Sequence, residues 1–225
     1  MGKIKPLHNL YDEAKKYIKK LPNPNYKYHK INLPFRMLLI GASGSGKTAT
    51  ALSIVRDFGK TFEKIVICTL NKEEPLYEML QDKNPEIEFY ESEIPDLDET
   101  FKKGSNGLII FDDLVSVKSL EPRINNYFKR ARKNDCSCMY ISQSYFAIPK
   151  FVRLQCNYIV IKKVNSNNDL RLIISDFNMD IPLQTLIKFY TFCKQDFLRC
   201  FLIDLESNDD DLKYRCNFES IKNVV

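Results

Sequence analysis

The sequence predicts an α/β fold in which a parallel β-sheet is covered by helices on both faces, forming a three-layer sandwich. Short apolar runs alternate with segments of helical periodicity from residue 34 onward. Most of these runs are continuously apolar, which is typical of parallel strands that are buried on both faces. The chain has 225 residues, 44% of them hydrophobic, which is enough for one such domain with a substantial core.

The expected elements follow in a regular order. Strands are predicted at residues 36–40, 64–70, 87–90, 107–112, 137–142, 157–162 and 197–205. Helices are predicted at residues 47–58, 75–81, 120–133, 168–177 and 183–194. There is no internal repeat or low-complexity segment, and we expect residues 33–225 to form one domain.

Residues 1–32 form a basic segment ahead of this domain. Eight lysines stand against Asp12 and Glu13 in residues 1–30, a net charge of +6, so the rest of the chain is close to neutral. Apolar residues recur at helical spacing over residues 5–21, which predicts an amphipathic helix followed by a linker. We favour packing of this helix on its own domain or on a neighbouring subunit over contact with nucleic acid or a membrane.

The composition argues against several classes of protein. Every apolar run is far shorter than a membrane span, and lysines interrupt the N-terminus where a signal peptide would need an apolar core. The seven cysteines form no CxxC pair and there are two histidines, so the ligand spacing of a zinc site is missing. We expect buried, reduced thiols, no membrane insertion and a reducing compartment.

A glycine-rich loop follows the first predicted strand. It consists of Gly41, Ala42, Ser43, Gly44, Ser45, Gly46, Lys47 and Thr48. These residues match G-x-x-x-x-G-K-[ST] at every specified position, and backbone N–H groups of such a loop converge on phosphate oxygens at a helix N-terminus. Lys47 would reach the β- and γ-phosphates of ATP, and the Thr48 hydroxyl would ligate Mg²⁺. A glycine-rich turn with an incidental lysine is the weaker alternative.

Two aspartates end the predicted strand at residues 107–112. Four apolar residues precede Asp112 and Asp113, as in a Walker B motif. Asp112 would hold Mg²⁺ through water, and Asp113 would orient and deprotonate the attacking water. A plain strand terminus is the alternative, but the glycine loop upstream favours ATP hydrolysis. Residues 71–74 resemble a guanine-reading motif only superficially, and we interpret them as a loop.

A polar strand end and a cationic helix end complete the candidate residues. If the strand at residues 137–142 lies beside the strand at residues 107–112, Gln143 faces the γ-phosphate and can sense it or hold water. A polar strand terminus is the alternative. Arg130 and Arg132 end the helix upstream, where cations also suit the helix dipole. The functional interpretation is an arginine finger that acts across a subunit interface, with Arg153 as a more distant third candidate.

Together these residues resemble the FtsK–HerA branch of P-loop ATPases, and more closely the genome-packaging ATPases of nucleocytoplasmic large DNA viruses and virophages. The resemblance runs from about residue 33 to 220 and includes 140–144, 201–205 and 214–218. Ala131 stands where a glycine is expected between the arginines, and Asp113 replaces the Glu of cellular FtsK-like enzymes.

This resemblance implies the ASCE, RecA-like form of the P-loop NTPase fold, with ATP and Mg²⁺ as cofactors. It also implies a homo-oligomeric ring, a pentamer or hexamer, that translocates double-stranded DNA without regard to sequence. A capsid portal or vertex protein is the implied partner. The implied location is the cytoplasmic viral factory of an infected cell, with the virion as an additional location.

Three functions compete on the sequence. The first is the DNA-translocating packaging motor. The second is a small P-loop kinase of nucleosides or nucleotides, which would need an arginine-rich lid that is not evident. The third is a structural capsid-associated protein with a vestigial loop. We expect the first, because every predicted catalytic position is filled and the Asp-Asp pair suits water activation.

Overall fold

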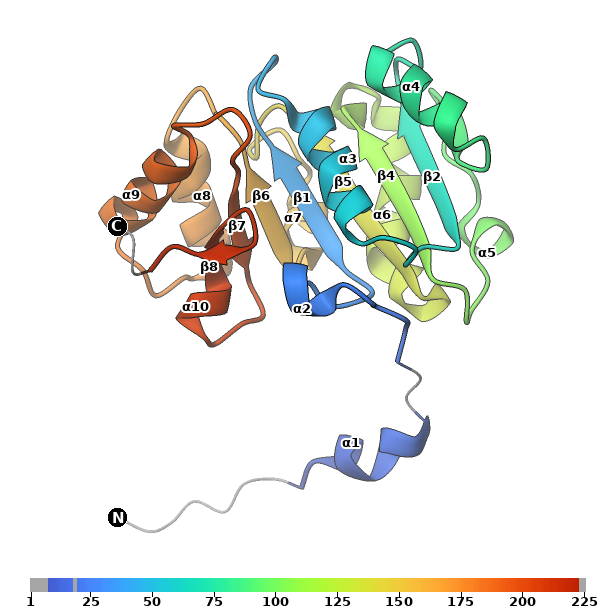
Figure 1. The fold of residues 1–225 in the computed structure, drawn as a ribbon, viewed down its shortest axis with the longest axis horizontal. Helices are drawn as coiled ribbons and strands as arrows, with labels where there is room; N and C mark the ends of the chain where they lie inside the picture. Colours follow the sequence, from blue (N-terminus) through green and yellow to red (C-terminus); the bar gives the residue numbers. More distant parts are fainter. Residues whose placement is uncertain (1–7, 18–19, 223–225) are drawn as a thin grey trace.

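The computed structural model describes residues 8–17 and 20–222. Within them, the chain forms a nine-stranded sheet in the order β3-β2-β4-β5-β1-β6-β7-β8-β9 (Figure 1). The strands are β1 (Arg36–Ile40), β2 (Lys64–Thr69), β3 (Glu88–Glu91), β4 (Gly107–Asp112), β5 (Cys136–Ser142), β6 (Tyr158–Ile161), β7 (Phe201–Asp204), β8 (Tyr214–Cys216) and β9 (Glu219–Ser220).

The sheet is mostly parallel. Every pairing from β3 across to β6 is parallel, as predicted. Strands β7, β8 and β9 pair antiparallel, which the sequence patterns did not predict. Two helices, α8 (Asn168–Phe177) and α9 (Leu183–Cys193), connect β6 to β7. After β6, one helix alone would carry the chain back to the end of the sheet where β6 begins, and the next strand would be parallel. The second helix carries the chain again to the end where β6 finishes, so β7 runs antiparallel to β6.

Helices cover both faces of the sheet (Figure 1). The described helices beside α8 and α9 are α2 (Tyr26–His29), α3 (Lys47–Asp57), α4 (Pro75–Lys83), α5 (Leu97–Thr100), α6 (Glu121–Arg130), α7 (Lys150–Gln155) and α10 (Asp210–Lys213), together with α1 (Leu10–Glu13), which lies away from the sheet (Figure 1). Two apolar clusters fill the two interfaces, and the neighbours Leu38 and Leu39 of β1 belong to different ones. Successive strand residues point to opposite faces, which explains why continuous apolar runs form these strands. The three-layer α/β sandwich is confirmed.

The last long strand begins later than predicted. The apolar run at residues 197–205 suggested one strand, but β7 starts at Phe201. The Asp196 carboxylate accepts a hydrogen bond from the Leu198 N–H at 2.8 Å and closes a turn. The Lys162 ammonium donates to the carbonyls of Phe197 and Arg199. These side-chain contacts hold residues 197–200 outside the ladder, which is why the strand prediction is wrong there.

The N-terminal segment lies away from the body of the molecule (Figure 1). Helix α1 and the 3₁₀ turn after it expose their apolar side chains, Leu10 at 69% and Tyr11 at 73%. The described part of the predicted helix therefore does not pack on its own domain. Residues 5–7 and 18–19 of the predicted helix lie outside the described residues. His29 and Ile31, assigned above to the linker, are fully buried. Among residues 8–17 and 20–222, every helix is too short or too polar to span a bilayer.

The cysteines are thiols. None of the seven, all of which lie in the described part of the chain, forms a disulfide; six are buried, and Cys216 is half-buried. Burial raises the pKa of thiols such as Cys68 and Cys156 above the usual range, which keeps them protonated. The expectation of buried, reduced cysteines is thus met.

Candidate active site

The strand register brings the predicted site residues to one edge of the sheet. Ile40, the last residue of β1, lies opposite Ser142 of β5, and Asp112 of β4 lies between Ile141 of β5 and Thr69 of β2. The carboxyl ends of four parallel strands therefore coincide. Strand β5 lies between the strand that precedes the glycine loop and the strand that ends in aspartate. Ligands of open α/β sheets bind at such an edge.

The glycine loop is anchored on both sides. The Gly41 N–H donates to the Ser142 carbonyl at 3.1 Å, and the Ala42 N–H donates to the Lys163 carbonyl at 2.7 Å. Gly44 and Gly46 have φ angles of +70° and +79°, in the left-handed region that glycine adopts without strain. Helix α3 starts directly after Gly46, so its first N–H groups, with the positive end of the helix dipole, face the loop. This is a phosphate-binding geometry.

Lys47 lies between the loop and the acidic strand end. Its ammonium donates to the Ala42 carbonyl at 3.0 Å. Burial lowers its pKa, and the negative charges of Asp113 and Asp112 oppose this shift. The ammonium therefore lies within the electrostatic field of both carboxylates. A polyphosphate bound by the loop would lie next to all three groups.

Asp112 ends β4 and is half-buried. Its Oδ2 accepts a hydrogen bond from the Tyr77 hydroxyl at 2.6 Å. Burial raises the pKa of Asp112, and so does Asp113, whereas the Tyr77 hydrogen bond and the charge of Lys47 oppose the rise. A carboxylate on the last residue of a buried strand, fixed by a tyrosine, is a well-ordered oxygen donor next to the start of α3.

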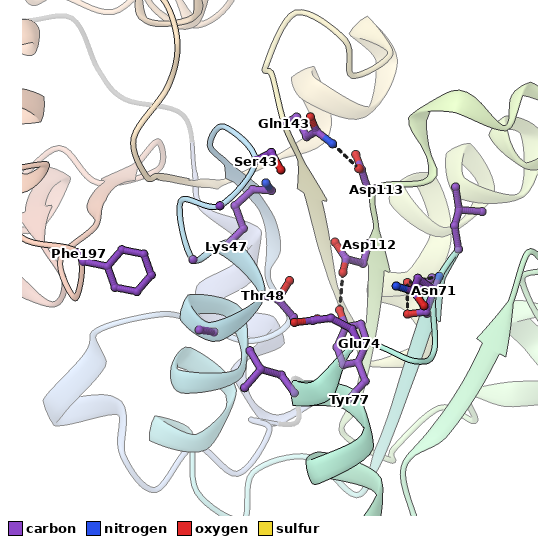
Figure 2. Close-up of a pocket in the computed structure, with 16 residues that line it drawn as sticks. Ser43, Lys47, Thr48, Asn71, Glu74, Tyr77, Asp112, Asp113, Gln143 and Phe197 are labelled. Carbon is purple, nitrogen blue, oxygen red and sulfur yellow. Dashed lines mark hydrogen bonds between the residues drawn. The ribbon is translucent and has the colours of Figure 1, made fainter.

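Asp113 and Gln143 form a pair across β4 and β5. The Gln143 amide donates to the Asp113 Oδ2 at 2.8 Å (Figure 2). Asp113 has φ +54°, a left-handed conformation that turns the chain sharply after β4. The predicted neighbourhood of the two strands is confirmed, and it places Gln143 beside the second aspartate rather than at an isolated strand end.

These residues line one cavity of about 580 Å³ (Figure 2). Sequence reasoning found its glycine loop, its two aspartates and Gln143. It missed the other lining residues: Ala49, Thr69, Leu70, Asn71, Glu74, Leu76, Tyr77 and Phe197. Most of these follow β2, whose carboxyl end lies at the same edge as that of β4. The signal was therefore the position of residues 70–77 directly after a parallel strand.

Glu74 is the most notable of the missed residues. It precedes α4 in the loop at residues 71–74, which is a loop as interpreted but also a wall of the cavity. Burial raises its pKa, and Asp112 adds to the rise, while a hydrogen bond with the Thr48 hydroxyl opposes it. A third carboxyl group therefore lies close to Thr48 and Asp112.

The arginines lie elsewhere. Helix α6 ends at Arg130 just before β5 begins, at the edge of the sheet opposite to the cavity. Arg130 forms an ion pair with Asp98 at 2.9 Å, and Arg132 is exposed. Arg153 is buried and pairs with Asp176 at 3.3 Å. None of the three lines the cavity of its own chain.

Known proteins match both the sequence and the structure. A family model described as Poxvirus A32 protein matches residues 24–203. The genome packaging NTPase B204 of Sulfolobus turreted icosahedral virus 2, solved with AMP, has a TM-score of 0.59 at 14% identity, covering 83% of this chain and 98% of B204. B204 from Sulfolobus turreted icosahedral virus, described as a DNA-packaging ATPase, gives 0.59 at 15% identity with the same coverage, 83% and 98%.

A bacterial protein shares the same architecture. EssC (ATPases 2 and 3) from Geobacillus thermodenitrificans has a TM-score of 0.57 at 8% identity, covering 83% of this chain and 39% of EssC. At such identities the structural likeness establishes the fold, a mostly parallel α/β sheet shared with these ATPases. No curated protein matches the sequence significantly.

Proposed function

The chain belongs to the poxvirus A32 protein family, and on that premise we propose that it is an ATP-driven motor that moves double-stranded viral DNA into a preformed capsid. One observation carries the proposal. A complete triphosphate-binding loop, two aspartates and a glutamine at the next strand end line a single cavity on this scaffold. The structurally similar B204 is itself described as a genome packaging NTPase.

The loop would hold the phosphates of ATP. Backbone N–H groups of residues 44–48 would cradle the α- and β-phosphates, and the Lys47 ammonium would leave the Ala42 carbonyl for the β- and γ-phosphates. The Thr48 hydroxyl and the Asp112 carboxylate are hard oxygen donors of the kind Mg²⁺ prefers. In the described part of the chain, no group of three or more His, Cys, Asp or Glu side chains is arranged to hold a metal ion. Phosphate oxygens of ATP and water would supply its other ligands, and Mg²⁺ would neutralise charge on the phosphates.

Asp113 would act as the general base. It would take a proton from water while the water oxygen attacks the γ-phosphorus and the bond to the ADP oxygen breaks, giving ADP and inorganic phosphate. Gln143 already donates to Asp113 at 2.8 Å, so a γ-phosphate or its attacking water would compete for the same amide. Gln143 would then change its hydrogen-bond partner when ATP is bound or hydrolysed. Because Gln143 directly follows β5, this change would act on the end of β5.

Motor function would need other subunits and DNA. Arg130 and Arg132 lie at the sheet edge opposite to their own cavity, so either could serve as an arginine finger only in the site of a neighbouring protomer. A ring of five or six subunits would provide that neighbour. Loops and lysines of the N-terminal segment that line the pore of the ring would contact DNA phosphates without regard to sequence. A capsid portal or vertex protein would complete the assembly at the viral factory.

The test is ATP hydrolysis by the purified chain with and without double-stranded DNA. We expect DNA to stimulate turnover and Lys47→Ala to reduce it by at least about 100-fold, because electrostatic stabilisation of the transferred phosphoryl group is lost. The matched control is Lys60→Ala, which removes an exposed lysine beyond the end of α3. An ATP turnover rate that is the same with and without DNA, together with phosphorylation of free nucleosides, would instead support a nucleoside or nucleotide kinase.

A further inference from the structure

An exposed phenylalanine stands beside the glycine loop. Phe197 lies in the turn between α9 and β7 and is 62% exposed. A Cβ atom on Gly46 would come within 2.6 Å of its ring, so the ring packs directly against the backbone of the loop. Figure 2 shows Phe197 on the side of the loop that faces away from Asp112 and Asp113.

The backbone of this phenylalanine is held in place. The Lys162 side chain is buried, and its ammonium donates to the carbonyls of Phe197 and Arg199, the latter at 2.9 Å. The same ammonium lies 5.3 Å from the centre of the Phe197 ring. Asp196 closes the turn through the Leu198 N–H. The ring therefore stands on a backbone anchored from two sides, as a preorganised binding surface requires.

Two cavities meet at this ring. A second cavity of about 290 Å³ shares Gly46, Ala49 and Phe197 with the phosphate cavity. Its further lining residues include Tyr28 and Phe218, whose rings pack edge to face with centroids 5.2 Å apart. The second cavity is not lined by Asp112, Asp113 or Gln143.

The direction of a bound nucleotide follows from these positions. The γ-phosphate belongs near the two aspartates, so the α-phosphate lies at the start of α3. The nucleoside must then leave the loop on the side away from the two aspartates, and Phe197 lines the cavity on that side (Figure 2). A base has two apolar π-faces that gain from stacking on an aromatic ring.

We propose that Phe197 is the stacking platform for the purine base of ATP, with Tyr28 and Phe218 lining the space beyond it for the rest of the nucleoside. This inference rests on the proposed ATP site, which it extends from the phosphates to the base. Gly46 then has two tasks, since it turns the loop and leaves room for the Phe197 ring.

The absence of tryptophan from this sequence allows a direct test. In Phe197→Trp the new indole is the only one in the chain. We expect ATP to quench its emission by stacking, and inorganic tripolyphosphate, which has no base, to bind without quenching. The matched control is Phe151→Trp on α7, also a partly exposed phenylalanine, which lines neither cavity. Its emission should respond to neither ligand.

Affinities give the second measurement. Phe197→Ala should weaken ATP binding about tenfold, as loss of one base–aromatic stack does, and leave tripolyphosphate binding unchanged. Equal losses for both ligands would overturn the inference, because the ring would then only support the loop. ATP binding to Phe197→Trp without quenching would overturn it too. If the unmodified protein bound neither ligand, the proposed ATP site itself would fall, so the two failures are distinguishable.

Discussion

The assignment of the general base leads to a specific prediction for Asp113→Asn. Asparagine has the size of aspartate and keeps a carbonyl oxygen that can accept the Gln143 amide, now 2.8 Å from Asp113 Oδ2. It also tolerates the left-handed backbone of this position, at φ +54°, whereas alanine would add strain of about 1 kcal/mol. The substitution therefore removes the negative charge and the basicity, and leaves packing and backbone in place.

The expected size of the effect follows from this selectivity. A positioned general base contributes about 10²–10⁴-fold to a rate, so kcat should fall by about that factor, or roughly 3–5 kcal/mol in the barrier. Asp112, Thr48 and Lys47 are untouched, so nucleotide affinity should stay close to that of the unmodified protein. The variant would bind ATP and fail to split it.

Phosphate release at saturating ATP and DNA measures kcat, and titration with a non-hydrolysable analogue measures affinity. Glu74→Gln is the informative control, because Glu74 is the other carboxyl group near Thr48 and Asp112. We expect it to retain most of its turnover. Hydrolysis at the normal rate by Asp113→Asn would show that Asp113 is not the general base. If Glu74→Gln were inactive and Asp113→Asn active, Glu74 would be the base instead.

Two further predictions concern the assembly and the stability of the fold. Mixing Lys47→Ala with Arg130→Ala protomers, or with Arg132→Ala protomers, should restore part of the hydrolysis if the finger acts across subunits; absence of rescue in both mixtures would contradict that placement. Burial, with the positive charge of Arg215 as a smaller cause, lowers the pKa of His29 from 6.5 to about 4. The unfolded chain therefore takes up this proton first as the pH falls, so His29 destabilises the fold progressively between pH 6.5 and 4, by about 2 kcal/mol at pH 5 relative to pH 7. Urea unfolding at pH 5 and pH 7 measures the free energy of unfolding. In His29→Gln the difference between the two pH values should be smaller by this amount, and an unchanged difference would show that another group causes it.

Local patterns in the sequence carried much of the fold. The strands at Arg36–Ile40 and Gly107–Asp112 and the helix at Asn168–Phe177 have the predicted bounds. Such runs encode their own state, because continuous apolar character on a strand or three-to-four-residue spacing on a helix reflects which faces are buried. The glycine loop was equally readable, since left-handed turns need glycine at particular positions.

Side chains that act on distant backbone were harder to predict. Residues 197–200 precede an apolar strand and include Phe197 and Leu198, yet Lys162, which directly follows β6, donates to the carbonyls of Phe197 and Arg199 and keeps this segment out of the sheet. Arg153 was a candidate for catalysis, but Asp176 and the ring of Tyr145 hold it in the interior. Each of these contacts joins segments that carry no mark of one another in the sequence.

By itself, the sequence determined the class of fold, the glycine loop with Lys47 and Thr48, and the strand that ends in Asp112. These features depend on residues that are neighbours in the chain. Only the tertiary structure decided that Glu74 and Tyr77 face the same cavity, that Phe197 packs against the loop, and that Arg130 lies at the far edge of the sheet. The physical reason is that strand order and register, which arise from the packing of the whole sheet, determine which loops meet at its edge.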